Sequence, residues 1–359
     1  MNVFLATTSL ASAYGGPAVS VAGLATALGK AGVRVGLWAS DNSAVSACVG
    51  SDPENLDPLG GDATDALSAF GSVDVLHDNG LWLPHNHWLA TLAIRRHIPR
   101  VVSTRGMLEP WAMRHKGAKK KLAWWLYQRR DLRSAQLLHT TAAQEAATVQ
   151  QYDLGVPIVT IPNGVDLPPP ERRETAQPRP WRHVLFLGRI YPVKGLPMLV
   201  RAWARVRPSG WRLQIAGPDE GGHRAEVERI VAAEGVGDTV KFLGPLEGQA
   251  KKAALQEAEL LVLPSHSESF GMVVAEALAY GLPVLTTTPT PWQKLIERDC
   301  GWWVEPTVEG IAEGLRAAAR QDVATLASMG ARGRDWVAAE FSWKAVANQF
   351  LAAYESILS

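Results

Sequence analysis

Cysteine is almost absent from this chain of 359 residues. Cys48 and Cys300 lie far apart and lack the close spacing of a zinc-binding pair. Two isolated thiols exclude a disulfide scaffold and indicate a reducing compartment. Apolar runs long enough to cross a bilayer, about 20 residues, are also missing, and no Lys or Arg precedes the apolar start at the amino terminus, which disfavours a signal peptide. These absences predict a cytoplasmic protein.

The chain also lacks an excess of charge of either sign. Its 36 Lys and Arg residues nearly balance its 35 Asp and Glu residues, so that the formal net charge is +1. A protein that binds duplex nucleic acid needs a basic field, so we expect no nucleic-acid partner and a small substrate instead. Neither G-x-G-x-x-G nor G-x-x-x-x-G-K-[ST] occurs, which argues against a dinucleotide enzyme and a P-loop ATPase.

Short apolar and β-branched runs recur along the chain between helical or turn segments. We predict strands at residues 3–7, 33–39, 73–77, 101–104, 137–141, 158–161, 184–187, 212–216, 240–243, 260–263 and 283–287. Such alternation is typical of doubly wound α/β sheets, and the length suits two domains. The proline-rich segment 167–182 interrupts the rhythm and is predicted to be a linker between domains 1–166 and 183–341.

The last segment, residues 342–359, has apolar side chains at helical spacing: Trp343, Val346, Phe350, Leu351, Tyr354 and Leu358. We therefore predict a helix that packs on one of the two domains. The spacing alone leaves open whether that is its own domain or the first one.

Two glutamates near the carboxyl end form the most specific motif. Residues 264–276 read PSHSESFGMVVAE, so that Glu268 precedes a predicted helix and Glu276 lies two turns inside it. Two such carboxylates can accept hydroxyl groups from two sugar rings, while the free N–H groups of the first turn face an anion between them. This pattern predicts a nucleotide-sugar site.

A second motif supplies positive charge. Residues 187–195 read LGRIYPVKG and follow a predicted strand, which places Arg189 and Lys194 in one loop. A guanidinium that binds phosphate oxygens bidentately and an ammonium that acts as a point charge can together neutralise a diphosphate without a metal ion. The alternative is a pair of ordinary surface cations.

Glycines follow several predicted strands. Gly15 and Gly16 allow close approach of the backbone to a ligand at the start of a helix, whose partly positive end favours phosphate. Gly217, and the Leu243-Gly244 step, can let a base or ribose approach, although such loops often only turn the chain. Asn163-Gly164 before the linker is either a hinge or part of the site.

Residues 114–133 carry eight Lys or Arg residues and the single acidic residue Asp131. On a helix, Leu122, Trp125 and Leu126 share one side and cations another, which is the layout of a helix that lies on a membrane surface. We expect either an anionic membrane or a solvated basic helix whose tryptophans pack inward.

Together these motifs resemble those of the retaining glycosyltransferases of family 4, which have the GT-B fold. The resemblance covers essentially the whole chain. It rests on Glu268-x7-Glu276 and is supported by Gly188-Arg189 with Lys194-Gly195, by Pro162-Asn163-Gly164-Val165-Asp166 and by Gly15-Gly16.

The resemblance implies two Rossmann-like domains that face a central cleft, with the last helix crossing back to the first domain. It implies that Arg189 and Lys194 hold the donor diphosphate together with the amide of Gly16. Backbone amides that assist them would belong to Phe270, Gly271, Met272 and Val273. Glu276 would bind the ribose hydroxyls, and Glu268 the donor sugar.

One residue departs from the family pattern. Many members have a histidine after the fourth strand of the first domain, where this chain has Arg105 within residues 103–111. That run resembles a branch of cell-surface polysaccharide enzymes. Arg105 is a candidate to contact a sugar hydroxyl or a phosphate. His77 is a second candidate for the sugar or acceptor side, with a structural histidine as the alternative.

The resemblance implies transfer of a hexosyl group, with retention, from a UDP- or GDP-linked sugar to a glycan or lipid-linked acceptor. No D-x-D motif occurs, so we expect neither a metal ion nor a cofactor. The alternatives are a nucleotide-sugar epimerase, a phosphorylase, or an inactive partner subunit that binds the donor. We expect a peripheral protein at the inner face of the membrane if residues 114–133 bind lipid.

Overall fold

The computed structural model describes residues 1–11, 15–44, 55–114, 117–169 and 180–358. The chain divides into two compact units. The first contains Met1–Gly164 and Phe341–Ser359, and the second contains Val165–Glu340. Most of the predicted linker, residues 170–179, lies outside the described residues, and its last residue, Arg182, already begins a strand of the second unit.

The first unit is built on a sheet of seven strands in the order β3-β2-β1-β4-β5-β6-β7, and every adjacent pair is parallel. The strands are β1 (Asn2–Thr7), β2 (Arg34–Ala39), β3 (Leu56–Leu59), β4 (Val75–Asn79), β5 (Arg100–Ser103), β6 (Leu137–Thr140) and β7 (Ile158–Thr160). The inner strands are buried on both faces, as their continuous apolar runs predict. All were predicted to within two residues except the edge strand β3, which was missed.

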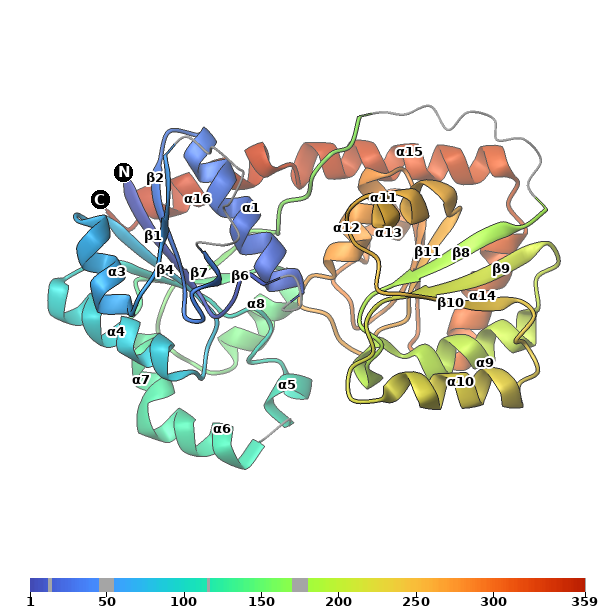
Figure 1. Ribbon diagram of the computed structural model, residues 1–359, viewed down its shortest axis with the longest axis horizontal. Helices are drawn as coiled ribbons and strands as arrows, with labels where there is room; N and C mark the ends of the chain where they lie inside the picture. Colours follow the sequence, from blue (N-terminus) through green and yellow to red (C-terminus); the bar gives the residue numbers. More distant parts are fainter. Residues whose placement is uncertain (12–14, 45–54, 115–116, 170–179, 359) are drawn as a thin grey trace. The chain divides into compact units, whose positions relative to one another are not determined.

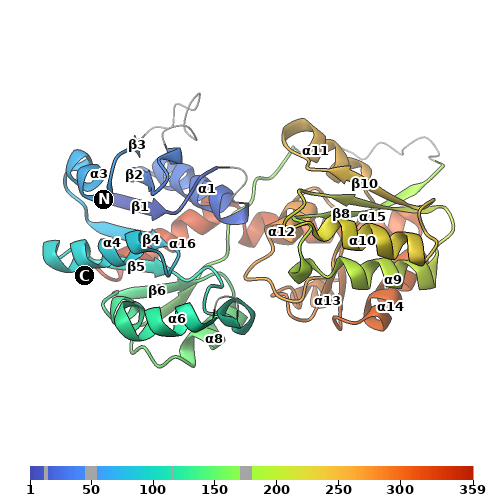
Figure 2. The same cartoon turned by 60° about the horizontal axis from the view of Figure 1, so that its bottom comes forward.

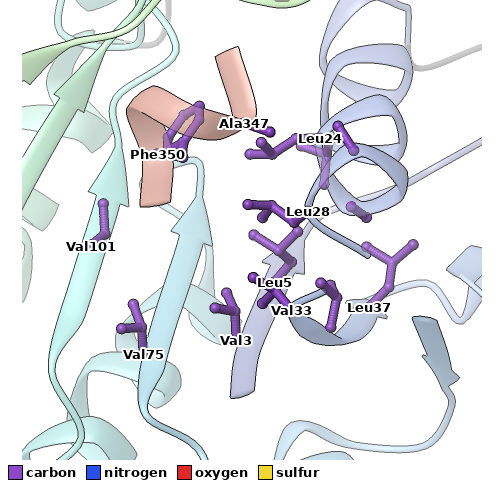
Figure 3. Close-up of a cluster of buried hydrophobic side chains, with 14 of the residues drawn as sticks. Val3, Leu5, Leu24, Leu28, Val33, Leu37, Val75, Val101, Ala347 and Phe350 are labelled. Atoms are coloured by element: carbon purple, nitrogen blue, oxygen red, sulfur yellow. The ribbon is translucent and has the colours of Figure 1, made fainter. Parts of the chain in front are cut away.

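Helices cover both faces of this sheet (Figure 1). Their bounds are α1 (Gly16–Lys30), α3 (Ala63–Phe70), α4 (Pro84–Arg96), α5 (Pro110–Arg114), α6 (Gly117–Ala123), the π-helical turn η2 (Trp124–Gln128), α7 (Arg129–Arg133), α8 (Ala143–Gln150) and α16 (Trp343–Glu355). Leu24 and Leu28 of α1 point toward Leu5 of β1, and Phe350 of α16 lies over the same core (Figure 3). On the opposite face, α3 and α4 bury a second apolar cluster around Phe4.

The last helix therefore packs on the first unit, although the whole of the second unit lies between β7 and this helix in the sequence. Trp343, at its start, lies so close to two glycines that side chains there would collide with the indole. A Cβ at Gly23 would come within 2.0 Å of the ring, and one at Gly164 within 2.2 Å. These two glycines are required by close packing.

The second unit is built on six parallel strands in the order β10-β9-β8-β11-β12-β13. The strands are β8 (Arg182–Leu187), β9 (Trp211–Ala216), β10 (Val240–Gly244), β11 (Leu260–Leu263), β12 (Val284–Thr287) and β13 (Gly301–Val304). The sequence predicted five of them and missed β13, which lies at the edge of the sheet.

The helices of the second unit are η3 (Pro192–Lys194, a 3-10 turn), α9 (Leu196–Val206), α10 (His223–Ala233), α11 (Gly248–Glu257), α12 (Met272–Ala279), α13 (Lys294–Glu297), α14 (Val308–Ala319) and α15 (Val323–Glu340). Helix α9 contacts both α10 and α14 on one face, and α12 contacts α15 on the other (Figure 2). No described helix is long and apolar enough to cross a membrane.

Both sheets reverse their strand order at one point. In the first unit the chain goes outward from β1 to β2 and β3 and then returns to β4 on the other side of β1. In the second unit it goes from β8 to β9 and β10 and returns to β11. The prediction of two doubly wound α/β sheets is thus confirmed. Loops after the two central strands diverge at such a reversal and leave room for a ligand.

Candidate functional site

Lys194 and Glu268 meet at the strand reversal of the second unit. Lys194 lies at the end of the loop after β8, and Glu268 lies in the loop after β11. Strands β8 and β11 are neighbours in the sheet. The ammonium nitrogen of Lys194 lies 2.5 Å from Oε1 of Glu268, and the side chains are 15% and 11% exposed. The hydroxyl of Ser265 donates to the same oxygen at 2.6 Å. Both bonds go to Oε1, which leaves Oε2 of Glu268 for a ligand.

The backbone holds these two loops together. The N–H of His266 donates to the carbonyl of Val193 at 2.7 Å. Gly195 has φ +67°, and a Cβ at this position would lie 2.1 Å from the carbonyl oxygen of Pro264. Only glycine permits both the left-handed conformation and this approach. Lys194 is thereby fixed next to the loop that carries Glu268.

The Phe-Gly step fixes the start of α12. Gly271 has φ +78° and is the N-cap of the helix, and the indole N–H of Trp292 donates to the carbonyl of Phe270 at 2.5 Å. The rings of Phe270 and Trp292 are both buried. The amides of Met272 and Val273, in the first turn, have no acceptor within the helix. The helix therefore presents donors and the positive end of its dipole beside Lys194 and Glu268.

Glu276 lies inside α12 and is paired with a cation that the sequence did not indicate. Its Oε1 lies 2.7 Å from the ammonium nitrogen of Lys251, which belongs to α11. The two residues are 25 positions apart on different helices, so no local spacing relates them. Lys251 could be found only once the packing of α11 was known.

Arg189 does not share a carboxylate with Lys194. Its guanidinium forms an ion pair with Glu220, from the loop after β9, and the two side chains are 47% and 42% exposed. The chain segments after β8 and β9 are joined here by a bridge between Ile190 and Asp219. Arg189 and Lys194 thus belong to the same loop but pair with different carboxylates. Glu220, like Lys251, was missed by the sequence motifs.

The two other predicted backbone positions of this unit lie at the ends of β9 and β10. Gly217 has φ +148°, and a Cβ there would lie 1.8 Å from the carbonyl oxygen of Gly188, so close packing against the loop after β8 already requires glycine. Leu243 is half-buried beside an irregularity in the pairing of β10 with β9. The N–H of Gly217 donates to the carbonyl of Gly244 at 2.8 Å.

In the first unit, Gly15 and Gly16 form the start of α1 after β1. Gly15 is the N-cap, with φ +79° and ψ −144°, a combination essentially restricted to glycine. Gly16 is exposed. Both glycines lie at the strand reversal of the first unit, and their contact with a ligand stays a prediction.

Arg105 connects three elements of the first unit. Its guanidinium donates to Oδ1 of Asn79 at 2.6 Å, to Oδ1 of Asn163 at 2.7 Å and to Oγ of Ser20 at 3.1 Å. Burial lowers the pKa of Arg105 to about 10, so that it stays charged at neutral pH. Asn163 thus has a definite partner, and the end of β4, α1 and the segment before Gly164 are held by one cation.

Glu145, in the first turn of α8, shapes the loop that carries Arg105. Its buried carboxylate accepts hydrogen bonds from Thr104 Oγ1 and Gly106 N, and also from the amide and hydroxyl of Thr141, all between 2.5 and 2.8 Å. An acidic residue in a first helical turn is a recognised signal of a helix start, but it does not reveal that the carboxylate fixes a neighbouring loop.

His77 was a candidate for the sugar or acceptor side, with a structural histidine as the alternative, and its buried contacts support the alternative. The side chain is fully buried in a chain of hydrogen bonds that runs through Tyr354 Oη, His77, Ser103 Oγ and His139 to the carbonyl of Ile161. Burial, with His139 and Arg105 nearby, holds the pKa of His77 well below its ordinary value. These contacts are those of a structural histidine.

The terminal carbonyl of Ile161 fixes the direction of this chain. A carbonyl only accepts, so His139 donates from Nε2 and, being neutral, accepts at Nδ1 from Ser103. Ser103 then accepts from Nε2 of His77, whose Nδ1 accepts from Tyr354. Every member of the chain is satisfied, which ties α16 to β4, β5 and β6 of the first unit.

Comparisons with known proteins agree with this architecture. The model described as "Glycosyltransferase Family 4" matches residues 14–168, and the one described as "Glycosyl transferases group 1" matches residues 169–336. The chain belongs to the family-4 glycosyltransferases. Both matches together span nearly all of the two units, and the resemblance read from the motifs is confirmed.

Several members of this glycosyltransferase family are similar in sequence. A D-inositol 3-phosphate glycosyltransferase from Arthrobacter sp. (strain FB24) is 31% identical over 43% of this chain and 39% of its own length. A GDP-mannose:cellobiosyl-diphosphopolyprenol alpha-mannosyltransferase from Komagataeibacter xylinus is 28% identical over 56% of this chain and 51% of its own. The chain thus matches about two fifths to half of the length of these curated relatives.

Two solved structures share the fold of the whole chain. Sucrose-phosphate synthase from Thermosynechococcus elongatus superposes with a TM-score of 0.80 at 20% identity and covers 99% of both chains. HepE from Anabaena, solved in complex with UDP-glucose, gives a TM-score of 0.77 at 17% identity and covers 99% of this chain and all of its own. At these identities the likeness shows the GT-B fold.

Replacing Gly195 by Ala tests the contact between the two loops. We expect a loss of stability clearly larger than that of Gly210→Ala, because both glycines have positive φ but only Gly195 faces a backbone oxygen within 4 Å. The clash should add about 1–3 kcal/mol to the cost of the strained φ. Urea denaturation of both variants measures the difference. Equal losses would mean that the loops do not need this contact.

Proposed function

We propose that the chain is a retaining hexosyltransferase, which moves a sugar from a UDP- or GDP-linked donor to a hydroxyl group of a glycan or lipid-linked acceptor. The observation that carries the proposal is the pairing of Lys194 with Glu268 at the strand reversal of the second unit, beside the amino terminus of α12. A cation, free amides and a carboxylate with one open oxygen are the groups that a diphosphate sugar requires.

The diphosphate would be held without a metal ion. Lys194 would exchange Glu268 for a phosphate oxygen, and the amides of Met272 and Val273 would donate to another. Arg189, on its exposed loop, would turn from Glu220 to the same group. Positive groups fixed before the reaction stabilise the charge of the departing nucleotide most effectively, because they need no rearrangement in the transition state.

The two glutamates would orient the rest of the donor. Oε2 of Glu268 would accept a hydroxyl of the transferred sugar, while Glu276 would accept the ribose hydroxyls after Lys251 moves aside. In the reaction, the bond from the anomeric carbon to the diphosphate oxygen breaks as the acceptor oxygen bonds to the same face. The acceptor proton passes to the departing diphosphate, so no protein base is needed and configuration is retained.

Names of similar proteins support this choice of substrates. One relative uses GDP-mannose and a diphosphopolyprenol-linked disaccharide by its name, and several are D-inositol 3-phosphate glycosyltransferases. HepE was solved with UDP, with UDP and glucose, and with UDP-glucose. These names are compatible with a hexose on UDP or GDP, and the name of the mannosyltransferase supports a lipid-linked glycan as the acceptor.

Turnover of UDP-glucose and GDP-mannose, with release of UDP or GDP as the readout, tests the proposal. We expect Lys194→Ala to lower kcat/KM by about 100- to 1000-fold through both kcat and donor affinity, because it removes charge from the leaving group. Glu268→Gln should lower kcat more than donor affinity. Lys252→Ala, an exposed neighbour of Lys251 on α11, is the matched control and should leave both constants unchanged.

Three results would contradict this function. Loss of turnover in EDTA would show that a metal ion is needed. Conversion of the donor to an isomer without any acceptor would identify an epimerase. Tight binding of UDP or GDP with no turnover for any hydroxyl acceptor would favour an inactive donor-binding subunit.

We also propose that the chain binds an anionic membrane surface through helix α6 and the turn η2. Leu122, Trp125 and Leu126 are 62%, 79% and 68% exposed and form an apolar patch at helical spacing. Of the two adjacent tryptophans, Trp124 packs inward against Tyr152, with ring centroids 5.0 Å apart. Exposed cations that flank the patch in the sequence are Lys119, Lys121, Arg130 and Arg133. Apolar insertion with about 1 kcal/mol per cation near anionic lipid gives reversible binding.

Vesicle sedimentation tests this surface. The double variant Trp125→Ser, Leu126→Ser should bind vesicles of phosphatidylglycerol and phosphatidylcholine at least tenfold more weakly, because each side chain loses roughly 1.5 kcal/mol or more of apolar burial. The control Ile94→Ser removes another exposed apolar side chain, which is 52% exposed and belongs to α4. Binding by the double variant equal to that of the wild-type chain would refute a membrane role for the patch.

A further inference from the structure

A pocket of about 630 Å³ lies wholly within the first unit, apart from the residues of the proposed donor site. It is formed at the carboxyl ends of β2 and β3, by the beginnings of α3 and α4 and by the turn η2. The residues that line it are Trp38, Ser40, Gly61, Asp62, Ala63, Pro84, His85, His87, Trp88 and Tyr127. A volume of this size holds a small organic ligand.

The lining consists mainly of rings. Trp38, His85, His87, Trp88 and Tyr127 supply five of them, whereas the described lining contains no Leu, Ile, Val or Met and no Lys or Arg. An isoprenoid or acyl chain calls for aliphatic walls, and a nucleotide or a phosphate calls for a cation. Aromatic faces with polar groups at the rim fit an uncharged ring that has apolar faces and hydroxyls at its edge, which describes a pyranose.

Three of these rings are fixed by hydrogen bonds to other residues of the first unit. The indole N–H of Trp38 donates to the carbonyl of Gly61 at 3.1 Å, and that of Trp88 donates to Oγ1 of Thr64 at 3.1 Å. The hydroxyl of Tyr127 donates to the carbonyl of Trp82 at 2.9 Å. The polar atoms of these three rings are thus bound within the protein, which leaves their faces, rather than their polar atoms, for contact with a ligand. This is notable for Trp88, because its side chain stays 45% exposed although its nitrogen is anchored.

Polar groups of the pocket retain bonding capacity. Nδ1 of His87 lies 2.7 Å from Oδ2 of the buried Asp131, which orients the imidazole and leaves Nε2 for a ligand. Asp62 accepts the amides of Thr64 and Asp65 with Oδ1 only, so Oδ2 is left. Nε2 of His85 is buried and has no hydrogen-bond partner among the described residues. Buried polar atoms usually have a hydrogen-bond partner, and a polar group of a bound ligand or a water molecule would supply one here.

We infer that this pocket binds a sugar ring of the acceptor glycan, stacked on Trp88 and hydrogen-bonded by Nε2 of His87. The inference rests on the proposed glycosyltransferase function and adds a class of acceptor, a saccharide. The pocket would bind an uncharged sugar ring of this acceptor, at a site separate from the hydroxyl group that reacts. Any phosphate of a lipid-linked acceptor would lie outside this pocket, because its described lining contains no Lys or Arg.

Saturation-transfer NMR and calorimetric titration of the full chain test the inference without any donor. The probes are the methyl glycosides of glucose, mannose and galactose, and cellobiose. We expect at least one of them to bind, and Trp88→Ala to weaken its binding about tenfold, the loss of one stacked aromatic ring. Ile94→Ala, on the same helix but outside the pocket, is the matched control and should bind like the wild-type chain.

A parallel titration with UDP and GDP separates this inference from the donor site, because Trp88→Ala should leave nucleotide binding unchanged. Saccharide binding that depends on Trp88 would support the pocket even if no nucleotide sugar were turned over, in which case only the transferase proposal would fall. Absence of binding for all four probes, or equal binding by Trp88→Ala and the wild-type chain, would overturn the inference. So would Trp88-dependent binding of farnesyl phosphate with no saccharide binding, which would identify a lipid pocket.

Discussion

The direct pairing of β8 with β11 in an all-parallel sheet is the constraint on which the candidate donor site depends. Because the chain leaves β8 toward β9 and returns to β11 on the other side, the loops after these neighbouring strands begin at the same edge. The close contact of Gly195 with Pro264 then brings Lys194 to Glu268, although 74 residues separate them. The sheet order thus converts two distant sequence motifs into one local arrangement of charge.

Each charged side chain of the proposed donor site already has an opposite charge beside it. Lys194 pairs with Glu268, Glu276 with Lys251, and Arg189 with Glu220. Partly buried ion pairs contribute little net stability, because desolvation offsets the attraction, whereas an unpaired buried charge is costly. In our account the donor replaces one ionic partner by another, so the ligand-free chain never carries isolated charges at the site.

The sequence predicted those features that local patterns determine. Inner strands such as β11 are continuous apolar runs, whereas the missed edge strands are irregular: β3 reads LDPL, with a proline that central strands exclude, and β13 begins with glycine. Lys251 and Glu220 were missed because tertiary packing alone pairs them with the motif residues. The sequence left His77 between a site role and a structural role for the same reason, since its partner Tyr354 is 277 positions away.

A crystal structure of the chain with UDP or GDP tests the central claim most directly. The account predicts the diphosphate beside the amino terminus of α12, with a phosphate oxygen about 3 Å from Nζ of Lys194 and the ribose hydroxyls at the carboxylate of Glu276. Lys194 and Glu268 should have separated from their present distance of 2.5 Å. A nucleotide bound with the ion pair intact, or with its ribose away from Glu276, would contradict the account.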